Sequence, residues 1–449
     1  MENKYDLIII GGGPGGYKTA TYAASKGYKV LLVEKAELGG TCLNHGCIPT
    51  KTYARHAEIV QTLRNAETFG LDNLSFSFNF QKAFERKNVV VESLRQGIAS
   101  LLSVPEITLV KGCAVLKSAN SIVVDDKEYF AKNIIIATGS SSKTLPLRDL
   151  SLDMVCDSTW LLDSPTLPKR ICIVGAGVIG MEFASILNSF GCEVSVVEYM
   201  KECLPALDCE IAKRLRKCLE KRGVAFYMQS SLIAASHGSV VFSRKDKETK
   251  VDVDKVLLAV GRKPNVDGLE LDSLGISYDK GGIKVNENMQ TNIPTVFAIG
   301  DVNGRQMLAH AAEMQGKMVV DYIVASETGE KSSPSSDIRL DIMPAAIFTN
   351  PEAACVGKTE EQLKNDGIEY VCQKHYYRAN GKAVAMGETE GMLKLLALAD
   401  GKIVGCHVYG AHAADLVQEV SALMCRDTTI QQLRNITHIH PTLSEVIVG

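Results

Sequence analysis

The stretch that decides the fold is YDLIIIGGGPGGYKTATYAASKGYKVLLVEK, residues 5–35. Its first apolar run predicts a buried strand that ends at Ile10. A helix and a second strand ending at Glu34 follow a turn with G-x-G-x-x-G spacing, whose glycines are Gly11, Gly13 and Gly16. Such a turn lets a diphosphate sit at the helix N-terminus, and Glu34 can accept hydrogen bonds from a ribose. A bare G-x-G-x-x-G also fits a tight turn followed by an incidental surface glutamate.

The same pattern occurs a second time, in RICIVGAGVIGMEFASILNSFGCEVSVVEY, residues 170–199. Its glycines are Gly175, Gly177 and Gly180, and Glu198 ends the second strand. In both copies 23 residues separate the first glycine from the glutamate (34 − 11 and 198 − 175). Two copies in one chain predict two dinucleotide-binding folds. An enzyme with both sites is expected to pass electrons between a bound flavin and a soluble nicotinamide.

Length and composition are those of a multidomain globular protein. The 449 residues exceed what a single hydrophobic core usually organises. The chain is 46% hydrophobic and 22% charged with a net charge of −3, which disfavours nucleic acid or an anionic membrane surface as a partner. No apolar stretch approaches a membrane span and no signal peptide is apparent, so we expect a cytoplasmic protein. Most of the 13 cysteines, such as Cys172 and Cys355, lie in apolar patterns typical of reduced core residues.

Three further strand ends fit this plan. IIIATGS (134–140) and LLAVGRKPN (257–265) each end an apolar run near a glycine, Gly139 and Gly261. In TNIPTVFAIGDVNG (291–304), Asp301 directly follows a buried strand and can bind a ligand hydroxyl, although an N-cap role is equally consistent with its position.

The C-terminal part has a different character. After the polar segment 326–337, which we expect to be a flexible linker, come a strand-like stretch at 395–409 and a helix-like stretch at 413–424. These patterns predict a separate α+β domain. Near its end, His440 and Glu445 are spaced so that a carboxylate could orient an imidazole for acid–base chemistry. A histidine before a helix started by Pro441, with Glu445 merely exposed, is the alternative. No ligand set for a metal is apparent.

Assembled, these motifs resemble the flavin-dependent pyridine nucleotide-disulfide oxidoreductases over essentially the whole chain. GGTCLNHGCIPTK (39–51) is similar to the family's redox-disulfide motif, and GAGVIGMEF (175–183) to its nicotinamide-binding loop. HPTLSE (440–445) has the form usual in the members that act on lipoamide, whereas glutathione and trypanothione reductases typically carry serine in place of Leu443. His45 departs from the small apolar residue common at its position.

The resemblance assigns catalytic roles to four residues. Cys42 and Cys47 would form a disulfide that relays electrons, with Cys42 exchanging with the substrate dithiol and Cys47 lying against the flavin. The sequence places both inside one helix start. His440 would act as the base, held by Glu445 and supplied by the opposite subunit of a homodimer. Lys51 and Glu182 match family positions that pair beside the flavin and nicotinamide, although a surface ion pair is also consistent with them.

The implied fold is α/β, with two Rossmann-like dinucleotide-binding domains and a C-terminal α+β dimerisation domain. We expect an FAD-binding domain at 1–145 and 265–337, an NAD-binding domain at 146–264 and the dimerisation domain at 338–449. The implied cofactors are FAD and NAD, since the carboxylate of Glu198 would repel a 2′-phosphate.

The implied reaction is oxidation of protein-bound dihydrolipoamide, with NAD reduced to NADH. The expected partner is a lipoyl-bearing protein of a 2-oxo acid dehydrogenase or glycine-cleavage complex. A nicotinamide-consuming reductase of another small disulfide, or a non-catalytic flavin-bearing subunit, are the alternatives.

Overall fold

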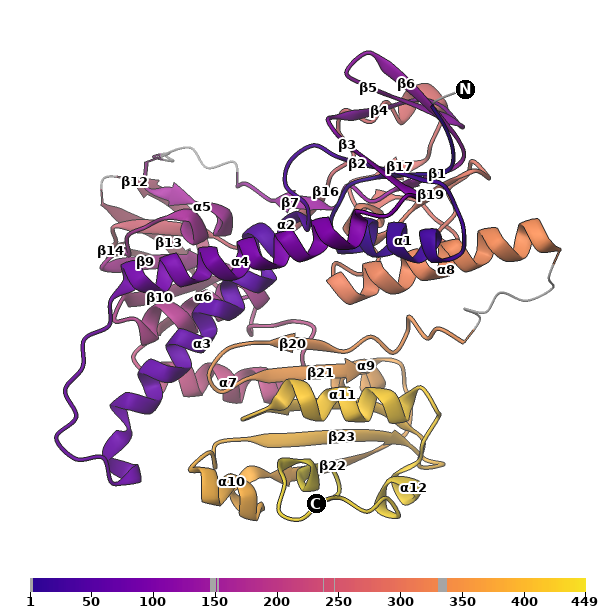
Figure 1. The fold of residues 1–449 in the computed structure, drawn as a ribbon. Coiled ribbons are helices and arrows are strands. Elements are labelled where there is room, and N and C mark those ends of the chain that lie inside the picture. Colours follow the sequence, from indigo (N-terminus) through magenta and orange to yellow (C-terminus); the bar gives the residue numbers. More distant parts are fainter. Residues whose placement is uncertain (1–2, 146–150, 152, 237, 246, 330–336) are drawn as a thin grey trace. The chain divides into compact units, whose positions relative to one another are not determined.

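The computed structural model describes residues 3–145, 151, 153–236, 238–245, 247–329 and 337–449. Its chain divides into two compact units, each assembled from three separate segments (Figure 1). The first comprises Met1–Pro49, Glu85–Lys143 and Arg262–Leu340, and the second comprises Thr50–Phe84, Thr144–Gly261 and Asp341–Gly449.

The first unit contains a mixed, mainly parallel sheet and two small two-stranded sheets. Its strands are β1 (Lys4–Ile10), β2 (Val30–Glu34), β3 (Ile107–Lys111), β4 (Ala114–Ser118), β5 (Ser121–Val124), β6 (Lys127–Ile136), β7 (Ser140–Ser142), β16 (Arg262–Pro264), β17 (Tyr278–Asp279), β18 (Gly282–Ile283) and β19 (Val296–Ala298). Its helices are α1 (Pro14–Ser25), α2 (Gly40–His45), α8 (Ala309–Thr328), η2 (Asp272–Leu274) and η3 (Gly300–Asn303). Two helices, α3 (Cys47–Arg64) and α4 (Phe80–Leu102), continue from one unit into the other.

The order in the main sheet is β3-β2-β1-β6-β5-β4, and β19 also pairs with the C-terminal end of β6. The pairs among β3, β2, β1, β6 and β19 are parallel, whereas β5 pairs antiparallel with β6 and β4. The first glycine turn therefore lies where β1 ends and α1 begins, at the carboxyl edge of a parallel sheet, which is where such folds bind nucleotides.

The second unit begins with a similar sheet of order β11-β10-β9-β15-β8 and a three-stranded antiparallel sheet, β12-β13-β14. The strands are β8 (Val155–Cys156), β9 (Arg170–Val174), β10 (Glu193–Glu198), β11 (Ala225–Met228), β12 (Ser231–Ser236), β13 (Ser239–Arg244), β14 (Lys247–Asp252) and β15 (Lys255–Leu258). The helices are η1 (Ala66–Phe69), α5 (Ser158–Asp163), α6 (Val178–Ser189) and α7 (Cys209–Lys221).

The C-terminal part of this unit is an antiparallel sheet of order β20-β21-β24-β23-β22 with α11 packed on it. The strands are β20 (Ala345–Ile347), β21 (Ala353–Gly357), β22 (Tyr370–Tyr376), β23 (Met392–Leu398) and β24 (Ile403–Tyr409). The helices are α9 (Glu360–Asn365), η4 (Tyr377–Ala379), α10 (Gly381–Met386), α11 (Ala413–Met424), α12 (Ile430–Arg434) and η5 (Leu443–Ile447).

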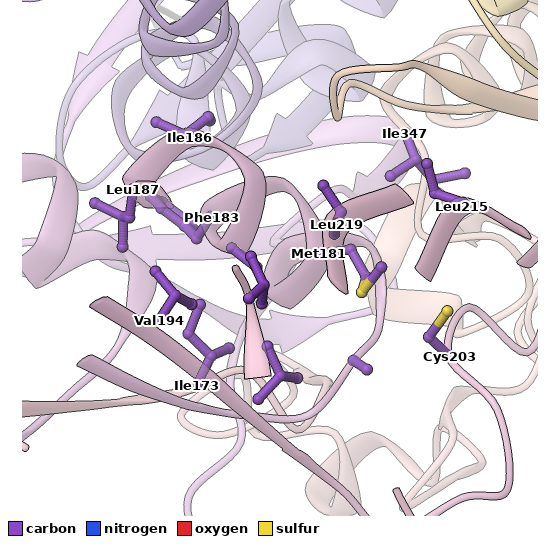
Figure 2. Packing of buried hydrophobic residues seen from close by; sticks show 14 of the residues in the cluster. Ile173, Met181, Phe183, Ile186, Leu187, Val194, Cys203, Leu215, Leu219 and Ile347 are labelled. Carbon is purple, nitrogen blue, oxygen red and sulfur yellow. The ribbon is translucent and has the colours of Figure 1, made fainter. Parts of the chain in front are cut away.

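One apolar core runs through the second unit. Figure 2 shows Phe183 and Leu187 of α6 beside Ile173 and Val194 of the sheet. The cluster also includes α7 and Ile347 of β20, so the nucleotide-binding and C-terminal parts share buried surface.

A buried cation reinforces that junction. The Lys394 side chain on β23 is 1% exposed, and its Nζ lies 2.8 and 2.9 Å from the two carboxylate oxygens of Asp208, which is 0% exposed. Lys394 also pairs with Glu360. Burial lowers the pKa of Lys394, but the hydrogen bonds to these two carboxylates outweigh it, and the net pKa is raised. Asp208 additionally caps α7 by accepting from the Glu210 amide.

Two expectations for the C-terminal region need correction. The polar segment 326–337 is not all linker, because α8 continues through Thr328, while 330–336 lie outside the described residues. The strand-like stretch at 395–409 belongs to two antiparallel strands, β23 and β24, since the chain turns back through Gly401. Among the described residues, no helix is long and apolar enough to cross a membrane.

Candidate active site and nucleotide-binding loops

Two glycines of the first glycine loop, Gly11 and Gly16, leave no room for a side chain. Gly11 has a φ of +112°, in the left-handed region, and a Cβ on Gly16 would lie 1.7 Å from the Gly11 carbonyl oxygen. Gly13 is the N-cap of α1 and provides no side-chain cap. The amides of the first turn of α1 are therefore left for a ligand, which is the arrangement that binds a diphosphate.

Glu34 lies against this loop. Its Oε2 accepts a hydrogen bond from the Gly12 amide at 2.6 Å, and its Oε1 accepts one from the Ala36 amide at 2.8 Å. Each carboxylate oxygen keeps a further lone pair. Glu34 thus braces the loop and retains capacity to accept from ribose hydroxyls, so these residues fit a bound dinucleotide.

The second loop repeats this construction. Gly175 has a φ of +103°, and a Cβ on Gly180 would lie 1.9 Å from the Gly175 oxygen. Glu198 accepts from the amides of Ala176 and Met200, both at 2.6 Å. The glycine turn and its glutamate therefore form a structural motif that occurs twice in the chain.

The two loops differ in what faces them. The Gly39 amide donates to the Gly12 oxygen at 2.9 Å, and a Cβ on Gly40 would lie 2.7 Å from the Gly13 Cα. The segment leading into α2 therefore lies directly on the first loop. A Cβ on Gly177, the N-cap of α6, would meet nothing within 4 Å among the described residues. Both loops have a neighbouring segment, because the Leu204 amide donates to the Ala176 oxygen at 3.0 Å; the difference is confined to the N-cap glycine, where Gly13 has Gly40 beside it.

Three predicted residues lie after strands. Gly139 and Gly261 have φ values of +72° and +104° beyond β6 and β15, respectively. Asp301 lies in η3 and accepts a hydrogen bond from the Ser140 hydroxyl. The N-cap of η3 is Ile299, so the N-cap alternative for Asp301 does not hold.

The two candidate redox cysteines lie on consecutive helices. Cys42 is in α2 and half-buried, and Cys47 is exposed and begins α3. The expectation of a single helix start is wrong, because Gly46 breaks the helix with a φ of −148°. Cys47 consequently occupies a helix N-terminus, where the macrodipole favours a thiolate. Asn44 fixes α2 through its amide, and its Oδ1 accepts from Arg95 at 2.8 Å, a contact that nothing in the sequence indicated.

Lys51 and Glu182 form the expected pair. Lys51 Nζ lies 2.7 and 2.9 Å from the two Glu182 oxygens, and Glu182 Oε1 also accepts from the Phe348 amide at 2.9 Å. The ammonium lies 4.8 Å from the centroid of the Phe348 ring. Glu182 is 3% exposed, so this is not a surface ion pair. Lys51 lies four residues after Cys47 in α3, a spacing that places both residues on one helix face.

His440 is oriented by Glu445. The distance from His440 Nδ1 to Glu445 Oε1 is 2.9 Å, and Oε2 accepts from the Thr442 amide at 2.9 Å. That amide and then His440 lower the pKa of Glu445. An ionised carboxylate only accepts, so Nδ1 carries the proton and Nε2 of the neutral ring is the basic nitrogen. The helix begins at Leu443 rather than at Pro441, and Glu445 is engaged, contrary to the simpler alternative.

Two residues far away in sequence hold this segment. Buried Asn380, which also caps α10, donates to the Thr442 oxygen at 3.0 Å. His375 Nδ1 lies 2.8 Å from the Val446 oxygen. Neither was apparent in the sequence, where both lie in unremarkable polar surroundings.

Two family models match this chain. The sequence model described as "Pyridine nucleotide-disulphide oxidoreductase" matches residues 5–316, and that of the family's dimerisation domain matches 343–449. The chain belongs to this family. It is therefore a flavoprotein disulfide oxidoreductase that uses FAD and NAD(H), with a C-terminal dimerisation domain.

Individual relatives cover nearly all of the chain. It is 36% identical to a mitochondrial dihydrolipoyl dehydrogenase of Pisum sativum, over 99% of this chain and 90% of that protein. It is 36% identical to a dihydrolipoyl dehydrogenase of Bacillus subtilis, over 100% and 97%. Among solved structures, the HOCl-induced flavoprotein disulfide reductase RclA of Escherichia coli has a TM-score of 0.86 at 28% identity and 98% coverage of both chains.

Proposed function

We propose that this enzyme oxidises protein-bound dihydrolipoamide to lipoamide and reduces NAD to NADH. The observation that carries the proposal is the His440–Glu445 pair, built within a segment whose form is usual in lipoamide enzymes. Leu443, where glutathione reductases typically carry serine, is 9% exposed and packs in the C-terminal core. Full-length relatives named dihydrolipoyl dehydrogenase support it.

The chain's own groups would perform the thiol chemistry. A substrate thiol gives its proton to His440 Nε2, and the resulting thiolate attacks Cys42 of an oxidised Cys42–Cys47 pair, which breaks that bond and releases Cys47 as a thiolate. The second substrate thiol then attacks the substrate sulfur bound to Cys42, displaces Cys42 and passes its proton to it, which leaves oxidised lipoamide, a Cys42 thiol and a Cys47 thiolate. Glu445 stabilises the imidazolium formed at His440, and the N-terminus of α3 stabilises the thiolate of Cys47.

The cofactors would occupy the two loops. The first loop with Glu34 and Asp301 would hold FAD, and the second loop with Glu198 and Glu182 would hold the exchangeable NAD. When bound, FAD would supply the two-electron transfer between the reduced cysteines and NAD.

The proposed active unit is a cytoplasmic homodimer in which His440 serves the cysteines of the partner subunit. Cys42→Ser and His440→Gln enzymes, mixed under exchanging conditions, would form hybrids with one intact site. About a quarter of wild-type activity should return, because half of the dimers are hybrid and each has one working site. No recovery after demonstrated exchange would reject the shared site.

The substrate is tested by anaerobic titration with dihydrolipoamide, following long-wavelength charge-transfer absorption and NADH formation. Reduction of glutathione disulfide by NADH or NADPH is measured in parallel. The likeness to RclA favours, as second candidate, a nicotinamide-dependent reductase of another disulfide. Turnover of dihydrolipoamide supports the first function. Reduction of the cysteines by NADH without lipoamide turnover supports the second.

A further inference from the structure

A cavity unrelated to the proposed reaction lies in the second unit, between α7 and the ends of β22, β23 and β24. Its volume is about 430 Å³, and its lining includes Arg214, Tyr376, Arg378, Glu390 and Tyr409. None of these lining residues belongs to a glycine loop, to the Lys51–Glu182 pair or to the His440–Glu445 pair.

One cation in the cavity is uncompensated. Arg378 is exposed, and its guanidinium lies 4.9 Å from the centroid of the Tyr376 ring. No carboxylate lies within ion-pair distance of Arg378 in the described parts of the chain. Stacking on an aromatic ring holds the planar guanidinium fork while leaving its N–H donors available.

The second cation has an unused donor. Arg214 Nη2 donates to Glu210 at 3.1 Å, but the buried Nε makes no hydrogen bond with any residue in the described ranges. The neighbouring Tyr409 hydroxyl donates its own proton to Glu390 at 2.9 Å. A buried guanidinium donor without an acceptor is unfavourable, which points to an acceptor that occupies the cavity.

The charge balance favours an anion. Glu390 is the carboxylate of the lining, and it is engaged by Tyr409 and lies 3.7 Å from Lys221. We propose that the cavity binds a small molecule bearing a phosphate or carboxylate group, held between the guanidinium groups of Arg214 and Arg378. The bound anion would connect α7 of the nucleotide-binding part with the C-terminal sheet.

The test uses the full-length FAD-loaded enzyme with saturating NAD, so that both dinucleotide loops are filled. Calorimetric titrations with inorganic phosphate and with succinate, in a chloride buffer, separate the two anion classes. Arg378→Met should weaken anion binding by about tenfold to a hundredfold, which is the affinity that charged hydrogen bonds typically contribute. Arg426→Met, an exposed arginine of the same domain, is the matched control and should bind as wild type does.

Arg214→Lys keeps the charge but removes the Nε donor, and should also weaken binding. Saturable binding should raise the unfolding temperature in wild type and not in Arg378→Met. The proposal is overturned if neither phosphate nor succinate binds saturably. It is also overturned if wild type and Arg378→Met bind the anion with equal affinity. These measurements need no lipoamide turnover, so they stand apart from the proposed reaction.

Discussion

Replacement of Lys394 by methionine is expected to loosen the C-terminal sheet strongly. Methionine preserves the apolar length of the side chain but removes the ammonium that faces Asp208 and Glu360. Asp208 is left 0% exposed, and within the described part of the chain its remaining donors are the amides of Glu210 and Glu360, at 3.1 and 3.2 Å. Solvent cannot reach the carboxylate to replace the lost hydrogen bonds.

The magnitude follows from the two hydrogen bonds that Asp208 loses. Each charge-assisted bond contributes about 1.5–3 kcal/mol, and breaking a buried pair typically costs about 3–5 kcal/mol. Lys374→Met is the matched control, because Lys374 lies directly opposite Lys394 on β22 and pairs with Glu210 at 2.6 Å. Lys374 is 37% exposed, so its loss should cost at most about 1 kcal/mol.

Native-state hydrogen exchange of β23 peptides measures the difference. Lys394→Met should speed exchange by about a hundredfold to several thousandfold, and Lys374→Met by less than about tenfold. Similar rates in the two variants would refute the reasoning and show that the desolvation of Lys394 offsets its attraction to Asp208. Asp208→Asn keeps the cap of α7. Comparison of the Asp208→Asn/Lys394→Met double variant with the two single variants therefore isolates the coupling energy between Asp208 and Lys394.

Acid should act on the same junction. Burial raises the pKa of Glu360, but hydrogen bonds from Lys364, Lys394 and Tyr370 outweigh it and place the pKa at about 2. A depressed carboxyl pKa stabilises the fold above its unfolded value of 4.5 and loses that effect as pH falls towards 2. Opening of β23, measured as exchange corrected for the intrinsic pH dependence of the amide rate, should increase across that interval in wild type and less in Lys394→Met.

Three further outcomes are expected. Cys47→Ser should purify with FAD, seen by its visible absorption, and yet lose lipoamide turnover; near-normal turnover would contradict the relay. Gly16→Ala should yield no flavin-bound protein, because its Cβ would strike backbone, whereas Gly97→Ala, open in α4, should bind FAD normally and gain about 0.5–1 kcal/mol. Asn380→Ser keeps a helix cap but loses the bond to the His440 segment, so kcat should fall by about threefold to tenfold. Thr359→Ala, which removes another cap in that domain, should leave kcat unchanged.

The two loops could be predicted from the sequence because their geometry depends on contacts within one strand–helix–strand unit. A Cβ at Gly16 meets a carbonyl five residues earlier, and Glu34 reaches the same turn through adjacent parallel strands. Spacing along the chain therefore determines the geometry. The α/β class and the helix at 413–424 were predicted correctly for the same reason, since they depend on periodicity within one element.

Contacts between segments that are distant in sequence could not be predicted from such patterns. The Lys51–Glu182 pair joins residues 131 apart and was expected only from the family resemblance. Asn380 gave no signal, because its hydrogen bond exists only once β22 and the C-terminal segment pack together. The break between Cys42 and Cys47 depends on the conformation of one glycine, which apolar periodicity does not report.

The close approach of Gly40 to Gly13 has a consequence for how the enzyme matures and ages. If the first loop holds the flavin, as proposed, the backbone that leads to Cys42 lies against the loop that binds it. Loss of the cofactor and disorder of the thiol-bearing helix are then expected to be coupled. Old or flavin-starved enzyme should therefore accumulate as molecules that lack both, rather than as partly functional intermediates.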